Sequence, residues 1–136
     1  MKDRVFLDTN LIFYLYSEDE HDKQSIILDL LPKYLNIIST QVINELSNIL
    51  FKKMKFTWAD IEDVTEELIQ NFEVRIIDIN IIKTAYFLAG KYNYNYFDSL
   101  MLASALENNC KVIYSEDMHH RQIIEEKLQI LNPFIP

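Results

Sequence analysis

Short apolar segments alternate with stretches of helical periodicity along the whole chain, and this alternation limits the folds that are possible. Residues 4–8 form a short, largely apolar run, which is typical of a strand buried on both faces of a parallel sheet. Further strands are expected at 36–39, 74–77 and 111–114, with an edge strand at 128–131. Helices are expected at 9–16, 21–31, 40–54, after Thr57, and at 80–92, 97–107 and 118–127. The pattern predicts right-handed βαβ units in a three-layer α/β/α fold with a mainly parallel sheet of four to five short strands.

The chain has the size and composition of one folded domain, and we expect a single domain over residues 1–136. Apolar residues make up 49% and charged residues 25%, a balance that excludes a disordered chain. No apolar run reaches the roughly 20 residues that a membrane-spanning helix needs, so no membrane partner is expected. Cys110 is the only cysteine, which excludes an internal disulfide and favours a reducing, cytoplasmic setting.

The formal net charge of −8 narrows the ways in which this chain could bind nucleic acid. Proteins that hold nucleic acid by counterion release are normally basic, so that mode is disfavoured. An acidic protein can still act on RNA if bound metal ions invert the field at its site. The acidity is equally compatible with a role in solubility alone, so charge does not decide the function.

Acidic residues stand at positions where a parallel sheet would bring them together. Asp8 directly follows the first strand, and Asp117 lies three residues beyond the strand that ends at Tyr114. Asp98 opens an apolar helix, and Glu45 lies at the margin of the apolar stripe of the helix after the second strand. Because ligands of open parallel sheets bind beyond the carboxyl ends of the strands, these acids are candidates for one shared site.

Several carboxylates in one pocket favour a divalent cation. Their mutual repulsion would raise their pKa values, and a bound cation removes that repulsion. Hard oxygen ligands suit Mg²⁺ or Mn²⁺ better than zinc. Such an ion can lower the pKa of a water and neutralise charge on a phosphodiester, so the site favours hydrolysis of a nucleic-acid backbone.

Each acid also has an ordinary structural explanation. Asp8, Asp98 and Asp117 could simply cap helices, since Asp is a favoured N-cap residue. Glu45 could be a solvated helix residue. The hypothesis of a shared site depends on the concurrence of all four acids.

Four segments of the chain, in order, resemble those of PIN domains. Val5–Asn10 is similar to the opening strand and first acid of that family, and Ser39–Leu46 to the segment that carries its Glu. Asn95–Ala105 is similar to its central helix, and Val112–Met118 to its last element, in which Ser or Thr stands two positions before the final acid. Each segment alone is weakly specific, whereas the ordered set spans nearly the whole chain.

The resemblance implies a PIN fold and Mg²⁺- or Mn²⁺-dependent cleavage of RNA. At this size the chain most resembles VapC-like toxins of bacterial toxin–antitoxin pairs, which are usually homodimers held inactive by a cognate antitoxin. Carried over by position, the resemblance assigns the metal ligands and catalytic acids as Asp8, Glu45 and Asp98, with Asp117 as a direct or water-mediated fourth. Asn10 and Ser115 would support the ligands by hydrogen bonds, and Glu116 could share or replace the role of Asp117.

Other residues allow more than one interpretation. Lys52 falls close to the azimuth of Glu45 and could meet an RNA phosphate, or it could complement the helix dipole. Tyr14 and Tyr16 could line a dimer or antitoxin groove, or belong to the core.

The alternatives to a toxin nuclease are a non-catalytic PIN-scaffold binding module and a housekeeping RNA-processing nuclease. A haloacid-type phosphatase would need a second Asp two positions after Asp8, where the chain has Asn10. A phospho-receiver domain would need an acidic pair near the end of the first strand, and Asp3 stands too early in the sequence to form that pair with Asp8.

Overall fold

The structure is a computed structural model that describes residues 1–136, and its sheet has six strands. The strands are β1 (Arg4–Leu7), β2 (Leu35–Ser39), β3 (Glu73–Arg75), β4 (Val112–Tyr114), β5 (Ile123–Ile124) and β6 (Leu128–Leu131). Their order across the sheet is β3-β2-β1-β4-β6-β5, and only the β5–β6 pair is antiparallel. The mainly parallel sheet is confirmed, with one or two more strands than the pattern predicted.

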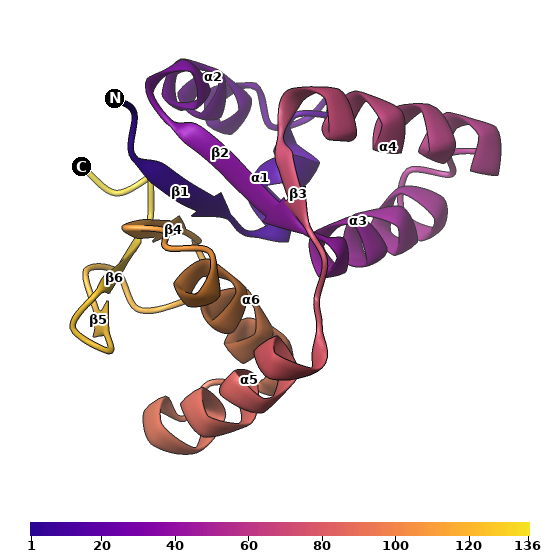
Figure 1. The fold of residues 1–136 in the computed structure, drawn as a ribbon. Coiled ribbons are helices and arrows are strands. Elements are labelled where there is room, and N and C mark those ends of the chain that lie inside the picture. The colour runs from indigo at the N-terminus through magenta and orange to yellow at the C-terminus, as the bar shows by residue number, and fades with distance from the viewer.

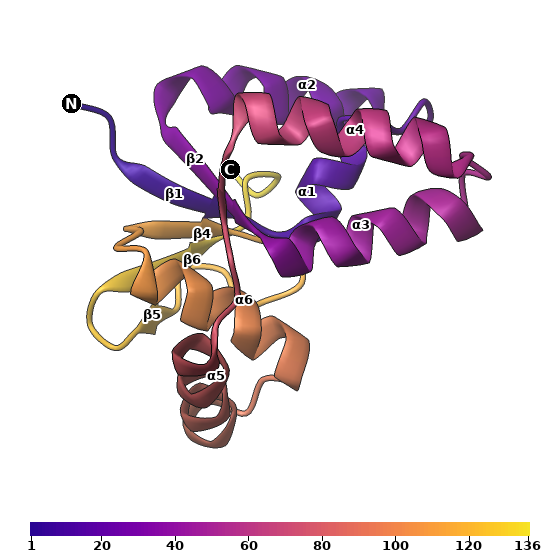
Figure 2. The ribbon, with the colours of Figure 1, turned by 45° about the vertical axis from the view of Figure 1, so that its right-hand side comes forward.

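Helices cover both faces of the sheet (Figures 1 and 2). On one side lie α1 (Thr9–Tyr14), α2 (His21–Leu30), the 3-10 turn η1 (Leu31–Lys33), α3 (Thr40–Lys52) and α4 (Trp58–Asn71). On the other side lie α5 (Ile79–Tyr92) and α6 (Tyr96–Glu107). The three-layer α/β/α arrangement is therefore confirmed. Helix α6 is the central one, because every residue from Ser99 to Ala105 is buried.

The connections reverse direction between β1 and β4. From β1 the chain moves outward to β2 and then β3 by way of α1 to α4, and it returns through α5 and α6 to the other side of β1. The carboxyl ends of β1 and β4 therefore flank the topological switch point, where open α/β sheets bind their ligands. The register pairs Leu7 with Tyr114, so the residues that follow the two strands start side by side.

Local sequence signals place several boundaries correctly. The helix expected after Thr57 is α4, and Thr57 caps it in a reciprocal pair with Asp60. Asn93 and Asn109 adopt left-handed backbone conformations, with φ of 63° and 58°, at the ends of α5 and α6.

The helix predicted at 118–127 is wrong. The chain there forms turns and the short strand β5, which pairs with β6 as a hairpin. Glu125 and Glu126 have φ of 50° and 59°, and a tight turn over residues 125–127 replaces helical backbone. The strand at 128–131 is confirmed, although β5 and not β6 forms the edge of the sheet.

Candidate active site

One pocket at the switch point contains all four predicted acids. Its volume is about 290 Å³ and it is lined by Asp8, Thr9, Asn10, Glu45, Asn48, Ile49, Asp98 and Asp117. The acids come from the end of β1, the middle of α3, the first turn of α6 and the segment after β4. Side chains far apart in the sequence thus meet because the carboxyl ends of two strands and the N-terminal halves of two helices share one rim of the sheet.

Asp8 lies at the centre of the site and is almost fully buried, with 5% of its surface exposed. Its Oδ1 accepts a hydrogen bond of 2.8 Å from the backbone N–H of Thr9, and its Oδ2 accepts one of 2.8 Å from the Ser115 hydroxyl. Burial raises the pKa of Asp8 to about 7, and the charges of Asp98 and Asp117 act in the same direction. Asp8 also caps α1 through the hydrogen bond from Thr9. Capping explains that bond, but it does not explain the burial that raises the pKa of Asp8.

Glu45 is held toward the pocket by neighbours from two helices. The Thr9 hydroxyl donates to Glu45 Oε1 at 2.6 Å, and the Gln41 amide donates to Oε2 at 3.3 Å. A solvated helix residue would need neither partner, so the structure favours a defined place for this carboxylate. Thr9 is buried and is the first residue of α1. Its hydrogen bond therefore connects the start of α1 to Glu45.

Asp98 lies in the first turn of α6 without serving as its cap. That role belongs to Asn95, whose side-chain oxygen accepts from the backbone N–H of Asp98 at 2.8 Å. The Asp98 carboxyl is partly buried, and burial followed by the charges of Asp117 and Glu45 raises its pKa. The Asp98 carboxylate is therefore free for another role at the pocket.

Asp117 is the most exposed of the four acids, and both predicted supporting residues, Asn10 and Ser115, contact it. The Asn10 amide donates to Asp117 Oδ2 at 2.8 Å, and the Ser115 hydroxyl accepts from the Asp117 backbone N–H at 3.2 Å. Asn10 and Ser115 thus each lie beside a candidate ligand.

Glu116 points away from the pocket. It accepts hydrogen bonds from the Tyr14 hydroxyl and from Lys23, whose Nζ lies 2.9 Å from Glu116 Oε2. Of the two adjacent acids, Asp117 therefore lines the pocket and Glu116 contacts α1 and α2, so the geometry favours Asp117 as the fourth acid. Lys52 ends α3 and does not line the pocket.

The charge of the pocket fits a divalent cation, although its side chains are not arranged as a closed ligand set. No Lys, Arg or His lines it, so no group of the protein neutralises the four carboxylates. No group of three or more His, Cys, Asp and Glu side chains is placed to hold a metal ion by itself. Glu45 and Asp117 are instead bonded to Thr9 and Asn10, so an ion would bind here together with retained waters or after small rotations of these side chains.

Sequence reasoning missed three residues that line the pocket, which are Thr9, Asn48 and Ile49. The spacing contained a signal for Asn48, because a residue three positions after Glu45 lies on the same face of a helix.

Comparison with known proteins gives the family. The family model described as the PIN domain matches residues 5–126. The chain belongs to the PIN-domain family. No curated protein matches it in sequence.

Solved structures resemble this PIN domain over most of its length at low sequence identity. A toxin–antitoxin complex from Klebsiella pneumoniae has a TM-score of 0.72 and 18% identity, covering 96% of this chain and 98% of that one. Mycobacterium tuberculosis VapC20, described as a toxin that cleaves the sarcin–ricin loop, has a TM-score of 0.68 and 13% identity, covering 83% and 89%. DNA-bound VapBC from Salmonella typhimurium has a TM-score of 0.64 and 21% identity, covering 94% and 96%. At these identities the likeness shows the fold.

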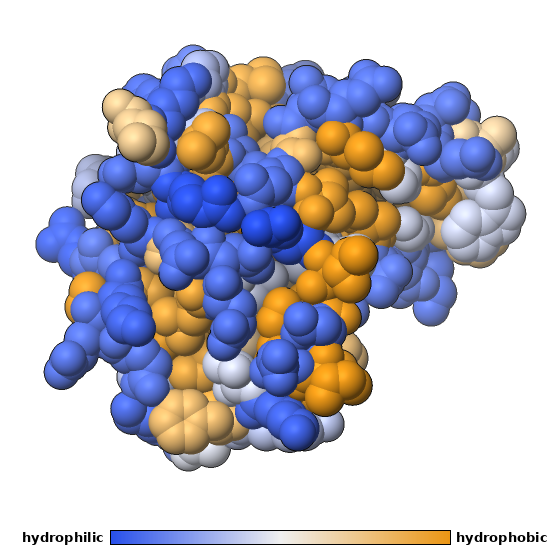
Figure 3. Space-filling model, in the orientation of Figure 1, coloured by the Kyte–Doolittle hydropathy of each residue, from blue (hydrophilic) through white to orange (hydrophobic).

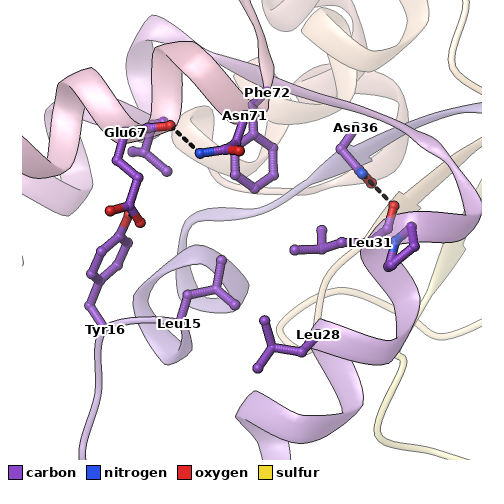
Figure 4. A pocket seen from close by; sticks show the side chains of 10 residues that line it. Leu15, Tyr16, Leu28, Leu31, Asn36, Glu67, Asn71 and Phe72 are labelled. Atoms are coloured by element: carbon purple, nitrogen blue, oxygen red, sulfur yellow. Dashed lines mark hydrogen bonds between the residues drawn. The ribbon is translucent and has the colours of Figure 1, made fainter.

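The PIN domain also has a larger, more apolar pocket of about 440 Å³, away from the acids. It lies between the end of α1, α2 with η1, and α4, and Figure 4 shows Leu15, Leu28 and Leu31 directed into it. Tyr16 lies at its side and donates to Glu67 at 2.9 Å, whereas Tyr14 is buried. Tyr16 therefore lines this pocket, and Tyr14 belongs to the core, as one of the two predicted alternatives has it. No helix of the structure has both the length and the apolar composition needed to cross a membrane.

Proposed function

We propose that this PIN domain is a Mg²⁺- or Mn²⁺-dependent endoribonuclease that acts as the toxin of a toxin–antitoxin pair. The observation that carries the proposal is the single pocket at the switch point, in which Asp8, Glu45, Asp98 and Asp117 meet without any cationic side chain. Family membership adds support, because residues 5–126, which the family model matches, include all four acids.

The residues of the pocket have separate roles in this proposal. Asp8, Glu45 and Asp98 would hold the cation, and Asp117 would bind it directly or through water. The ion, when bound, supplies a water of lowered pKa and neutralises charge that develops on the phosphodiester. Ser115 and Asn10 orient Asp8 and Asp117, so that these carboxylates are in place before substrate arrives.

The proposed partners are an RNA substrate, an antitoxin and a second copy of the chain. Three similar structures are toxins or toxin–antitoxin complexes, which supports the toxin role. The apolar groove of Figure 4 offers a surface that an amphipathic antitoxin helix could bury. Exposed apolar side chains between β3 and the start of α6 support a homodimer, and orange side chains lie beside the β3–α5 connection in Figure 3. The exposed apolar side chains of this segment are Ile76, Ile79, Tyr86, Phe87 and Phe97.

The test is cleavage of total cellular RNA and tRNA by purified protein in Mg²⁺, in Mn²⁺ and in a chelator. We expect cleavage with either metal, loss of cleavage in the chelator, and loss in Asp8→Asn and Asp98→Asn. Asp63→Asn, an exposed carboxylate of α4, is the matched control and should cleave like the native chain. Absence of cleavage in both metals would refute the enzyme, whereas growth arrest on expression that Asp8→Ala relieves would support the toxin role.

A further inference from the structure

The tip where α3 ends and α4 begins presents an exposed pair of stacked aromatic rings. Phe51 and Trp58 lie 4.3 Å apart between ring centroids at an interplanar angle of 11°. They are 43% and 61% exposed, so their stacking leaves much of both side chains in contact with solvent. The tip projects away from the sheet (Figure 2).

Three lysines lie between Phe51 and Trp58 in the sequence. Lys52, Lys53 and Lys55 are exposed, and none of them forms an ion pair. The other cations without an ion pair are scattered over the chain, and the net charge of −8 makes a cluster of three unusual. The nearest acid in sequence, Asp60, is bonded to the backbone N–H of Thr57. Exposed aromatic faces beside lysines are the combination that binds single-stranded nucleic acid, through stacked bases and contacted phosphates.

One face of α3 connects this tip to the acidic pocket. Glu45, Asn48 and Lys52 are spaced by three and four residues and therefore lie in one row along the helix. Glu45 and Asn48 line the pocket, and Lys52 lies seven residues beyond Glu45, which is about 10 Å of helix. A strand that passes through the pocket along α3 would meet Lys52 and then the aromatic pair.

We propose that the α3–α4 tip is a binding site for single-stranded RNA on one side of the scissile bond. A base stacks on the exposed face of Trp58, and Lys52, Lys53 and Lys55 contact the phosphates that flank it. This inference rests on the proposed ribonuclease function and adds to it the place and the chemistry of substrate binding.

Trp58 is the chain's single tryptophan, so its fluorescence reports directly on the proposed contact. The Asp8→Asn variant is titrated in a chelator, which prevents cleavage, with a single-stranded RNA of about ten nucleotides, within the usual range of site sizes. We expect saturable quenching, and weaker quenching by a fully paired duplex of the same sequence. No change in fluorescence on addition of the single strand would overturn the proposal.

Substitutions separate stacking from charge, with affinity measured by anisotropy of a labelled strand. Trp58→Ala should weaken binding by about 5- to 100-fold, and Trp58→Phe should restore most of the affinity, since a base–aromatic stack contributes about 1–3 kcal/mol and 1.4 kcal/mol is tenfold. Equal loss in the Ala and Phe variants would contradict a stacking role. Melting temperatures close to that of the native chain would show that both variants fold.

The lysines are tested together. The triple variant Lys52→Gln, Lys53→Gln, Lys55→Asn should reduce the salt dependence of binding, log K against log salt, by about 2, because each phosphate that a lysine neutralises on a single strand adds about 0.7 to the slope. Asn is chosen at position 55 because the backbone φ there is 56°. The matched control removes three exposed lysines elsewhere, at Lys33, Lys83 and Lys127. An equal reduction in the control would show that net charge alone matters and would overturn the site.

A second copy of the chain is the competing occupant of the tip. If a second copy binds the tip, Trp58 fluorescence would shift with protein concentration in the absence of RNA, and added RNA would leave the fluorescence unchanged. That result would overturn the proposal. Because binding is measured without metal or cleavage, failure here leaves the nuclease assay intact. Equally, an inactive protein that still shows quenching would refute only the proposed enzyme.

Discussion

The Ser115 hydroxyl lies between two carboxylates of the site, donating to Asp8 Oδ2 at 2.8 Å while accepting from the Asp117 backbone N–H at 3.2 Å. The pairing of Leu7 with Tyr114 in adjacent strands places Ser115 there. A single buried hydroxyl thus orients one acid directly and fixes the turn that carries another.

Removal of this hydroxyl should shift the pH dependence of activity. The Ser115 bond favours the charged form of Asp8, so Ser115→Ala raises the pKa of Asp8 above its native value of about 7. A hydrogen bond to a charged group contributes about 1.5–3 kcal/mol, so the acid limb of the rate profile should move up by about one to two pH units. The measurement is initial cleavage rate against pH at limiting Mn²⁺. Ser115→Thr, which keeps the hydroxyl, is the control, and identical profiles for native chain and Ala variant would contradict this role.

The raised pKa of Asp8 also predicts how stability changes with pH in a chelator. The folded chain holds a proton on Asp8 up to about pH 7, whereas an unfolded Asp releases it near 3.8. The folded state therefore binds more protons between these values, and stability should fall as pH rises from about 4 to 7 and then level off. Asp98 acts in the same direction because its pKa is raised as well.

Asp8→Asn removes this dependence on Asp8. The variant should be more stable than the native chain at pH 8 without metal, by a few kcal/mol at most, and Mg²⁺ should raise the melting temperature of the native chain only. Thermal melts at pH 5 and pH 8 give the result, with Asp3→Asn as an exposed control. A native chain that is equally stable at both pH values would show that Asp8 is not a carboxyl of raised pKa.

The adjacent acids Glu116 and Asp117 should separate in function. Asp117 faces the pocket, so Asp117→Asn should lower cleavage by about tenfold or more and weaken Mn²⁺ binding. Glu116 forms a partly exposed ion pair with Lys23, so Glu116→Gln should cost no more than about 1 kcal/mol, a few degrees in melting temperature, with cleavage retained. Activity and melting temperature of both variants decide the matter. The reverse pattern would place the fourth acid at Glu116.

Much of the site could be predicted because the carboxyl ends of parallel strands share one rim. Asp8 follows an apolar run and Asp117 follows another, so their meeting requires only the topology. To predict the position of Asp98, one must also know that α6 runs antiparallel to the strands, which places its first turn at the same rim. The contact of Glu45 with Thr9 could not be predicted, since it depends on how α1 and α3 pack together and no periodicity records this.

The hairpin at 123–131 shows where local reasoning fails. Glu is a good helix former, so Glu125 and Glu126 indicate helix and not a turn with two positive φ values. Contacts from α5 hold the turn, because the Tyr92 hydroxyl accepts from the Glu125 backbone N–H at 2.9 Å and Lys91 lies 2.5 Å from its carboxylate. Tertiary contacts outweigh propensity here, and a single sequence does not reveal them.

The apolar groove of Figure 4 leads to a prediction about the proposed antitoxin. Leu28 is 53% exposed at the groove, which is a substantial apolar surface for a side chain that a partner could cover. A charge placed there would have to be buried without a partner on binding, so Leu28→Asp should weaken capture of the antitoxin strongly.

Co-purification with the product of an adjacent small reading frame measures this effect. Leu35→Asp, on an exposed leucine of β2 outside the groove, is the matched control and should bind normally. Cleavage by isolated Leu28→Asp should equal that of the native chain, because the groove lies apart from the acids. In cells the variant should escape neutralisation and arrest growth even when the antitoxin is present. Full capture of Leu28→Asp would place the antitoxin on another surface.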